Sequence, residues 1–293
     1  MKAAVVLMAY GSPERLSDVP AYYSDIRGGR PIAPENLADL VERYRRLGIE
    51  DSSPLNAITE QTRAALEDEL EMPIFTGMKH WTPRIADAAE VALQSGAEEI
   101  VGLVLAPHYS ALSIAGYRDQ LERALNGRGE LRFVESWHDE PGFVELLADR
   151  VRGTDAHVVF TAHSLPARIL ELGDPYREQL LKTSRLVADA SGVSDWSFSF
   201  QSESPTGEPW LGPDILDHLE SLRGQGVERV LVCPVGFVSD HLEIRWDLDV
   251  EAQEKAAELG MQLERIEMPN ADPTFVRTLA GIVRRALSVP SPA

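Results

Sequence analysis

Short apolar runs alternate with amphipathic stretches along the whole chain. Runs typical of buried strands occur at residues 3–8, 73–77, 99–105, 131–135, 156–161, 196–201, 229–233 and 262–266. Helical patterns lie between them, at residues 35–47, 56–70, 83–94, 114–125, 142–151, 175–190, 213–222, 240–259 and 273–287, with Asn56 as the expected N-cap of the second. This alternation predicts an α/β fold of parallel strands with helices on both faces of each sheet.

Two of the strand-like runs end in nearly the same way. Residues 5–13 and residues 158–166 each finish an apolar run with a turn that contains proline, and Tyr10 and His163 occupy the same step. Open α/β sheets bind their ligands beyond the carboxyl ends of the strands. The two segments therefore present a phenol and an imidazole, and they predict a metal or a flat ligand between them.

A second pair of similar segments divides the chain into halves. Residues 96–100 resemble residues 226–230, and each segment leads a strand that is followed by proline. We expect two similar doubly wound, Rossmann-like lobes, each with a four-stranded parallel sheet flanked by helices, that face each other across a cleft. The predicted N-terminal lobe spans residues 1–152 and the C-terminal lobe residues 153–271, with a C-terminal helix at 272–288 that packs back on the first lobe and a loose tail at 289–293. Chance similarity between buried strands is the alternative.

The composition is that of an ordinary soluble protein, since 44% of the 293 residues are hydrophobic and 26% are charged. The net charge of −19 argues against non-specific nucleic-acid binding. No apolar run reaches the roughly 18 residues that a membrane span needs, so we expect a cytoplasmic protein without stable membrane insertion. The only cysteine, Cys233, is expected to be a buried structural thiol, and one cysteine cannot form an intrachain disulfide or a cysteine-ligated iron–sulfur site.

His163 is the histidine best placed for chemistry, because it follows a buried strand. A neutral imidazole accepts a proton or binds a divalent metal, although an isolated histidine is more often structural. Glu243, Asp247 and Glu251 follow another strand at the spacing i, i+4 and i+8, which stacks them on one helix face. Such an acidic ladder attracts divalent cations and relays protons if it lines a cleft. A solvated acidic face at the start of a helix is the alternative.

Further candidates are weaker. His108 and Tyr117 follow the third strand, and for His108 a structural role is favoured. Arg27, Arg30 and Arg43 lie close together in an acidic chain, where they indicate either a local anion site or solvated helix faces. No G-x-G-x-x-G motif follows a strand and no P-loop motif occurs, so no nucleotide cofactor is expected.

Several long motifs resemble the signatures of the ferrochelatases. Residues 161–166 read Thr-Ala-His-Ser-Leu-Pro, and residues 234–243 read Pro-Val-Gly-Phe-Val-Ser-Asp-His-Leu-Glu. Further matches occur at residues 8–13, 53–55, 105–110, 201–203 and 209–213, so the resemblance covers nearly the whole chain. It is greatest to the bacterial branch that inserts ferrous iron into coproporphyrin III.

The resemblance implies a role for each candidate. His163 and Glu243 match the histidine and the glutamate of the metal insertion site, where two pyrrole protons leave while Fe²⁺ loses its water ligands. Asp247 and Glu251 match an acidic ridge, a path for protons or incoming metal. Tyr10 matches the tyrosine that approaches the opposite face of the macrocycle and ligates the iron of the product.

The resemblance also implies a set of residues that bind the porphyrin. These are Tyr10, Arg27, Arg43, Tyr44, Ser53 and Tyr117, with Arg30 as a weaker candidate. Arginine suits carboxylates through its paired N–H donors. Coproporphyrin carries four propionates and protoporphyrin only two, so a basic rim favours coproporphyrin. Gly28 departs from the pattern, since some relatives carry a second arginine there. Part of the propionate-binding set is therefore left unassigned.

Fe²⁺ is then a substrate, and neither an iron–sulfur cluster nor a nucleotide is expected. The expected partners are coproporphyrin III and Fe²⁺, together with a transient iron donor or a haem-pathway enzyme, and the expected state is a monomer. Three alternatives remain open: a protoporphyrin IX ferrochelatase, a cobalt chelatase acting on sirohydrochlorin, and a non-catalytic haem or porphyrin carrier.

Overall fold

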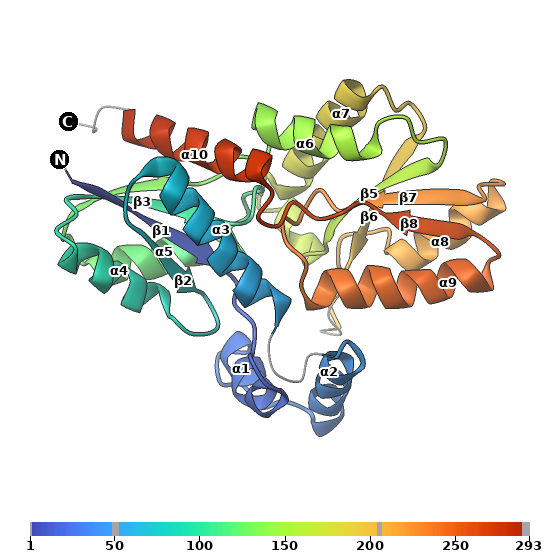
Figure 1. Cartoon of the computed structure of the whole chain (residues 1–293). Coiled ribbons are helices and arrows are strands. Elements are labelled where there is room, and N and C mark those ends of the chain that lie inside the picture. Colours follow the sequence, from blue (N-terminus) through green and yellow to red (C-terminus); the bar gives the residue numbers. More distant parts are fainter. Residues whose placement is uncertain (1, 49–52, 204–206, 289–293) are drawn as a thin grey trace.

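The computed structural model describes residues 2–48, 53–203 and 207–288, and it contains two four-stranded parallel sheets (Figure 1). The first sheet has the order β2-β1-β3-β4 and is built from β1 (Ala3–Ala9), β2 (Ile74–Met78), β3 (Glu99–Val104) and β4 (Glu130–Val134). The second has the order β6-β5-β7-β8 and is built from β5 (His157–His163), β6 (Trp196–Gln201), β7 (Arg229–Cys233) and β8 (Gln262–Arg265). The two orders are equivalent, so the predicted fold of two similar lobes is confirmed.

Helices cover the faces of both sheets, which is why the central strands read as continuous apolar runs. The helices that flank the sheets are α3 (Pro54–Leu70), α4 (Ile85–Gln94), α5 (Ile114–Leu125), α6 (Pro141–Val151), α7 (Tyr176–Ser191), α8 (Ile215–Gly224), α9 (Gln253–Glu258) and α10 (Pro273–Ser288). The last helix, α10, contacts α3 and α6 as well as β3 and β4 of the first sheet. The division at residue 152 stays a prediction, and the tail at 289–293 lies outside the described residues.

One apolar core connects the two sheets. It includes Leu7 on β1 and Phe160 on β5, and Phe143 on α6 packs against Phe275 on α10 within it. All four side chains are fully buried. Burial of each such side chain contributes roughly 1.5–3 kcal/mol, so the shared core holds the carboxyl ends of the two sheets in a fixed relation. Cys233, as expected, is a buried free thiol.

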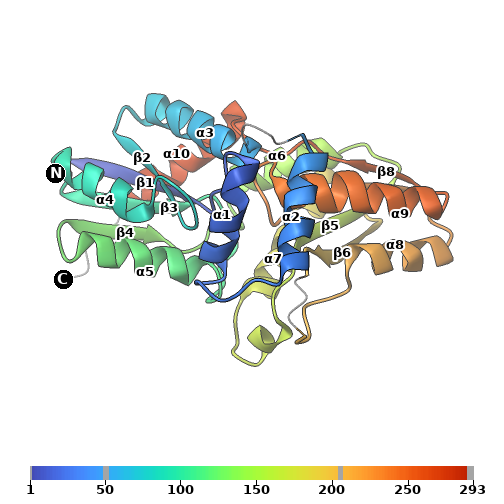
Figure 2. The ribbon, with the colours of Figure 1, turned by 90° about the horizontal axis from the view of Figure 1, so that it is seen from below.

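Two helices between β1 and α3 stand apart from the layers of the first lobe. They are α1 (Val19–Ile26), which the apolar pattern did not predict, and α2 (Pro34–Arg46), and a short 3₁₀ turn, η1 (Leu16–Asp18), leads into them. Figure 2 shows α1 and α2 side by side, with α2 on the side of the second lobe. Val19 and Tyr44 are buried in a small cluster of their own, and Leu242 of the second lobe packs against it. Helices α1 and α2 therefore bridge the two lobes.

The expected helix at 240–259 is wrong in its type. The chain instead forms a π-helix, η3 (Ile244–Ala252), which continues into α9. In a π-helix each N–H bonds to the carbonyl five residues earlier, and such segments are rare and frequent at functional sites. The wider turn brings side chains four residues apart closer to one line than an α-helix does. The spacing of Glu243, Asp247 and Glu251 thus still yields one face.

The start of α3 also differs from the expectation. The helix begins at Pro54, and the hydroxyl of Ser53 caps it by accepting from the backbone N–H of Leu55 at 3.4 Å. Asn56 is not the cap, because its side chain bonds in both directions to the backbone of Ser12, at 2.7 and 3.1 Å. This contact fixes the turn that follows Tyr10.

Candidate functional site

The site lies where the carboxyl ends of the two sheets meet. His163 is the last residue of β5, and Tyr10 is the residue directly after β1. The neighbouring strand β2 extends beside β1, since the backbone N–H groups of Lys79 and His80 donate to the carbonyls of Ala9 and Tyr10, each at 2.9 Å. The rings of Tyr10 and His80 then lie 4.6 Å apart between centroids.

His163 and Glu243 form an ion pair. The distance from His163 Nε2 to Glu243 Oε1 is 3.5 Å, and His163 Nδ1 donates to the carbonyl of Ser164. The hydroxyl of Tyr176 donates to the carbonyl of His163 at 3.0 Å, which holds the strand end in place. Burial lowers the pKa of His163, but the charge and hydrogen bonding of Glu243 outweigh it and raise that pKa to about 9. With that pKa, His163 is an imidazolium at pH 7 and must lose a proton before it can act as a neutral imidazole.

Glu243 lies between two imidazoles. Its second oxygen, Oε2, is 3.5 Å from Nε2 of His241, a residue that the sequence analysis did not single out. Burial raises the pKa of Glu243, but His163 and His241 together hold it well below its ordinary range. Glu243 is therefore ionised at neutral pH. Within residues 2–48, 53–203 and 207–288, no three histidine, cysteine, aspartate or glutamate side chains converge as a ready-made metal cage.

Asp247 is the most buried member of the acidic ladder, with 7% of its surface exposed. It accepts a hydrogen bond from the hydroxyl of Ser202, and Gln201 Nε2 donates to it at 3.4 Å. Burial and the charge of Glu243 raise its pKa to about 7. Asp247 consequently exchanges a proton near neutral pH, one helical step from Glu243.

Glu251, the outer member of the ladder, meets a residue of the other lobe. Glu251 Oε1 is 3.9 Å from a guanidinium nitrogen of Arg43. Arg43 also pairs with Asp39 at 2.9 Å and stacks over the ring of Trp246 on the π-helix, 5.2 Å from its centroid. Arg43 thus ties α2 to the acidic face of the π-helix.

The remaining residues expected to bind a porphyrin lie on the first lobe and on α1 and α2. Arg27 has a buried Nε with no hydrogen-bond partner among the described residues. Tyr44 is buried, with its hydroxyl 3.2 Å from Ser12 Oγ, and Ser53 is occupied as the cap of α3. Tyr117 is buried beneath the ammonium of Lys79, 4.7 Å from the ring centroid.

Weaker candidates fall in two places. Arg30 is exposed, and its Nε donates to the carbonyl of Arg27 at 2.9 Å. His108 is buried between the lobes, where its Nε2 lies 2.9 Å from Thr183 Oγ1.

The carboxylate of Glu243 on the second lobe acts electrostatically on two tyrosines of the first lobe. The pKa of Tyr10 is raised by partial loss of solvent around its phenol and by the carboxylate of Glu243, and the pKa of Tyr44 is raised by burial and by the same carboxylate. Tyr10 keeps 39% of its surface exposed. A phenol of the first lobe and the carboxylate–imidazole pair of the second therefore face the same space.

The sequence analysis missed Lys79, His80 and His241. Lys79 and His80 follow β2 directly, as Tyr10 follows β1, so the rule about carboxyl ends of strands was sufficient to find them. His241 stands within the motif that supplied Glu243. For Asp25, which bonds to His80, the sequence carried no signal.

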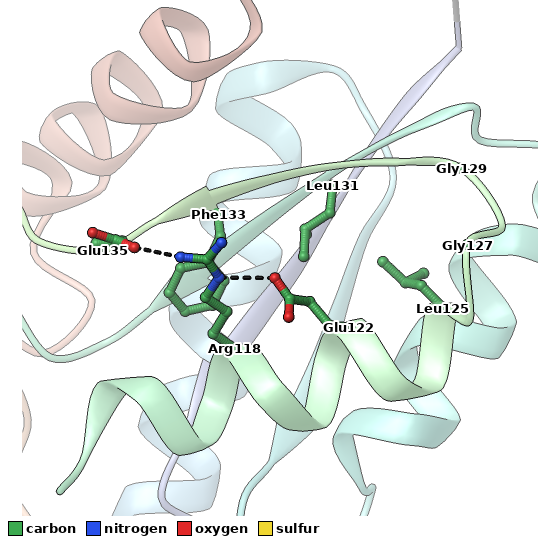
Figure 3. A pocket seen from close by; sticks show the side chains of 8 residues that line it. All are labelled: Arg118, Glu122, Leu125, Gly127, Gly129, Leu131, Phe133 and Glu135. Atoms are coloured by element: carbon green, nitrogen blue, oxygen red, sulfur yellow. Dashed lines mark hydrogen bonds and ion pairs between the residues drawn. The ribbon is translucent and has the colours of Figure 1, made fainter. Parts of the chain in front are cut away.

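A surface pocket of about 450 Å³ lies elsewhere, between α5 and β4 (Figure 3). Arg118 crosses it and pairs with Glu122 at 2.8 Å and with Glu135 at 2.5 Å. These three charged groups thus pair with one another within the pocket. In the part of the chain that the structure describes, no helix is long and apolar enough to cross a membrane.

Comparison with known proteins agrees with this geometry. A ferrochelatase family model matches residues 2–287. A ferrochelatase of Herpetosiphon aurantiacus is 44% identical over 96% of this chain and 98% of its own length, and the coproporphyrin III ferrochelatase of Bacillus subtilis is 40% identical over 98% of both chains. Among solved structures, SirB from Bacillus subtilis with Fe³⁺ has the same fold, with a TM-score of 0.63, 12% identity, and coverage of 98% of this chain and 96% of its own. The chain therefore belongs to the ferrochelatase family, whose members are lyases that insert ferrous iron into a porphyrin.

Proposed function

We propose that this ferrochelatase inserts Fe²⁺ into coproporphyrin III to give Fe-coproporphyrin in haem biosynthesis. The observation that carries the preference is Arg27, whose buried Nε donor has no partner among the described residues. A buried donor without an acceptor costs free energy that a carboxylate ligand relieves. Several relatives at about 40% identity are named coproporphyrin III ferrochelatases, and their substrate has more propionates to bind than protoporphyrin.

His163 and Glu243 are proposed to receive the metal. At neutral pH the pair is an imidazolium and a carboxylate, so His163 must lose a proton before its Nε2 can bind Fe²⁺. An arriving dication repels the imidazolium proton and stabilises the Glu243 carboxylate. The imidazole freed in this way then hands the metal to the macrocycle or takes one of the two pyrrole protons.

Asp247 is proposed to carry protons away from the pair. Its pKa of about 7 lets it accept a proton and release it again without a large energy barrier on either side. Glu251 lies farther along the same face and is more exposed. The ladder then leads from the partly exposed pair, past the buried Asp247, to the partly exposed Glu251.

On the first lobe, Tyr10 is proposed to bind the iron of the product. Arg27, Arg43, Tyr44, Ser53 and Tyr117 are proposed to border the porphyrin, with the arginines on its propionates. Arg43 has to exchange its contact with Glu251 for a substrate carboxylate, and the 3.9 Å separation of this partly exposed pair makes that exchange inexpensive.

Anaerobic metallation of two porphyrins tests the proposal. Purified protein is given Fe²⁺ with coproporphyrin III or with protoporphyrin IX, and the loss of free-base absorbance is followed. We expect a kcat/KM at least about tenfold higher for coproporphyrin III, equivalent to one carboxylate contact. Faster turnover of protoporphyrin IX would reverse the assignment of the substrate. Binding of both porphyrins without metallation of either would identify a carrier.

His163→Ala separates the enzyme from a carrier. For the enzyme, metallation falls sharply while the dissociation constant of the porphyrin changes little. Near-normal metallation by this variant would refute the role of His163.

A further inference from the structure

A second carboxylate–imidazole pair stands beside Tyr10. Asp25 Oδ2 lies 2.9 Å from His80 Nδ1, a closer contact than the 3.5 Å between His163 and Glu243. Arg84 holds the same carboxylate with both terminal nitrogens, Nη1 to Oδ2 at 3.1 Å and Nη2 to Oδ1 at 3.0 Å. The mechanism proposed above uses none of these three side chains.

The three residues come from three separate elements. Asp25 lies on α1, His80 follows β2, and Arg84 is the N-cap residue of α4. Arg84 Nη1 also donates to the carbonyl of Lys79 at 3.4 Å, which joins it to the backbone just before His80. The two-pronged contact of a guanidinium with a carboxylate fixes direction as well as distance. Asp25 therefore has little freedom to leave the position in which it meets His80.

The contact sets the state of the His80 ring. An ionised carboxylate only accepts hydrogen bonds, so His80 Nδ1 must carry the proton that it donates to Asp25. The neutral ring then keeps its lone pair on Nε2, and rotation about the side chain is restricted. A histidine is commonly oriented in this way by a carboxylate behind it.

His80 in turn touches Tyr10 at two points. Its backbone N–H donates to the carbonyl of Tyr10 at 2.9 Å, and its ring packs on the phenol with a centroid separation of 4.6 Å and an interplanar angle of 52°. Only 15% of the His80 side chain is exposed, whereas Tyr10 keeps 39% of its surface exposed. The more buried ring thus packs against the more exposed one.

We propose that Asp25 and Arg84 are positioning residues that act through His80 to hold the Tyr10 phenol in line with the iron of the product. This inference rests on the proposed function, because it takes Tyr10 as the axial ligand. Asp25–His80 on the first lobe and Glu243–His163 on the second then stand on opposite sides of the macrocycle. The second pair handles metal and protons, and the first fixes a ligand.

Binding of ferric coproporphyrin III tests the proposal without turnover. The probe is titrated into the protein, and the absorption band of an iron–phenolate bond is recorded together with the dissociation constant. We expect Asp25→Ala and His80→Phe each to weaken the band and to raise the dissociation constant about tenfold, the effect of one lost charge-assisted hydrogen bond. Asp25→Asn keeps an acceptor oxygen for His80 Nδ1 and is expected to restore most of the band.

The double variant Asp25→Ala/His80→Phe decides whether Asp25 acts through His80. If it does, the double variant binds the probe as His80→Phe does, because residues in one chain of contacts are not additive. Losses that add would overturn the proposal, and so would a wild-type band in Asp25→Ala. His80→Phe leaves the Asp25–Arg84 pair intact, so it provides the readout if Asp25→Ala fails to fold.

Asp195→Ala is the matched control. Asp195 Oδ1 meets His157 Nδ1 at 2.7 Å, in the same kind of pair, on the second lobe and at the amino end of its sheet. This variant is expected to keep the wild-type band. If wild-type protein itself gives no iron–phenolate band, the role of Tyr10 in the proposed function fails. If wild type gives the band and Asp25→Ala is unchanged, only the positioning role fails.

Discussion

His163 Nε2 lies 3.5 Å from Glu243 Oε1, and at neutral pH the proton of this pair resides on the imidazole. The pair is therefore neutral as a whole, although both members are charged. A dication gains access to the imidazole only by displacing that proton. If Fe²⁺ binds here, as proposed, its capture and the release of this proton are coupled.

Replacing Glu243 by glutamine should uncouple metal binding from proton release. Without the carboxylate, burial dominates and the pKa of His163 should fall below 6.5, its ordinary value. Metallation should drop at least about 100-fold, because one acid–base partner is lost. NMR titration of the histidine rings measures the pKa, and anaerobic porphyrin absorbance measures the rate. Glu254→Gln, on the exposed surface of α9, is the control and should change neither. A rate within a few-fold of wild type in Glu243→Gln would exclude its role.

The rate of metallation should depend on the raised pKa of His163. At subsaturating Fe²⁺, kcat/KM for the metal should rise with pH up to about 9, since more of the protein then has a free imidazole. Zn²⁺ is suitable for this profile because it is not oxidised by air. An inflection near 6.5 instead would show that Glu243 does not control the His163 proton.

Asp247→Asn should make the fold more stable in alkali. The folded-state pKa of Asp247, about 7, lies above the ordinary value of 3.8, so ionisation opposes folding as the pH rises through this range. A neutral amide removes that opposition and still accepts from Ser202. The expected gain at pH 8 is on the order of 4 kcal/mol, with little gain at pH 4.

Urea denaturation at both pH values measures the effect of Asp247→Asn. His163 contributes in the same direction, because its stabilisation is complete below about 6.5 and is lost as the pH rises through about 9. Glu243 contributes oppositely and loses its stabilisation in acid. A gain of equal size at pH 4 and pH 8 would show that packing, and not ionisation, causes it.

Arg27→Ala should weaken binding of the porphyrin more than Arg30→Ala does. The first removes a donor that is buried and unpaired among the described residues, and the second removes an exposed side chain that bonds to the Arg27 carbonyl. We expect KM for coproporphyrin III to rise about tenfold or more in Arg27→Ala, with a smaller change in kcat. Steady-state kinetics on both variants measure this. Equal effects would place the propionate contact elsewhere.

The sequence by itself determined the strands, the position of two site residues at strand ends, and the family. The eight predicted runs became the eight parallel strands of the described residues, and the central strands are continuous apolar runs because helices cover both of their faces. Tyr10 and His163 were recognised at matching strand ends, since the position of a side chain at a strand end follows from the run itself. The motifs around His163 and Glu243 were sufficient to identify the family.

Only the tertiary structure decided the state and surroundings of these residues. The π-helix at 244–252 arises from a shift of the backbone hydrogen bonds by one residue, which leaves the apolar pattern unchanged. The proton on His163 depends on the 3.5 Å approach of Glu243, some eighty residues away. Asp25 reaches His80 only because α1 folds against the end of β2, a contact between segments whose sequences have no common period. Distance and burial set protonation and ligand geometry, and both are properties of the packed molecule.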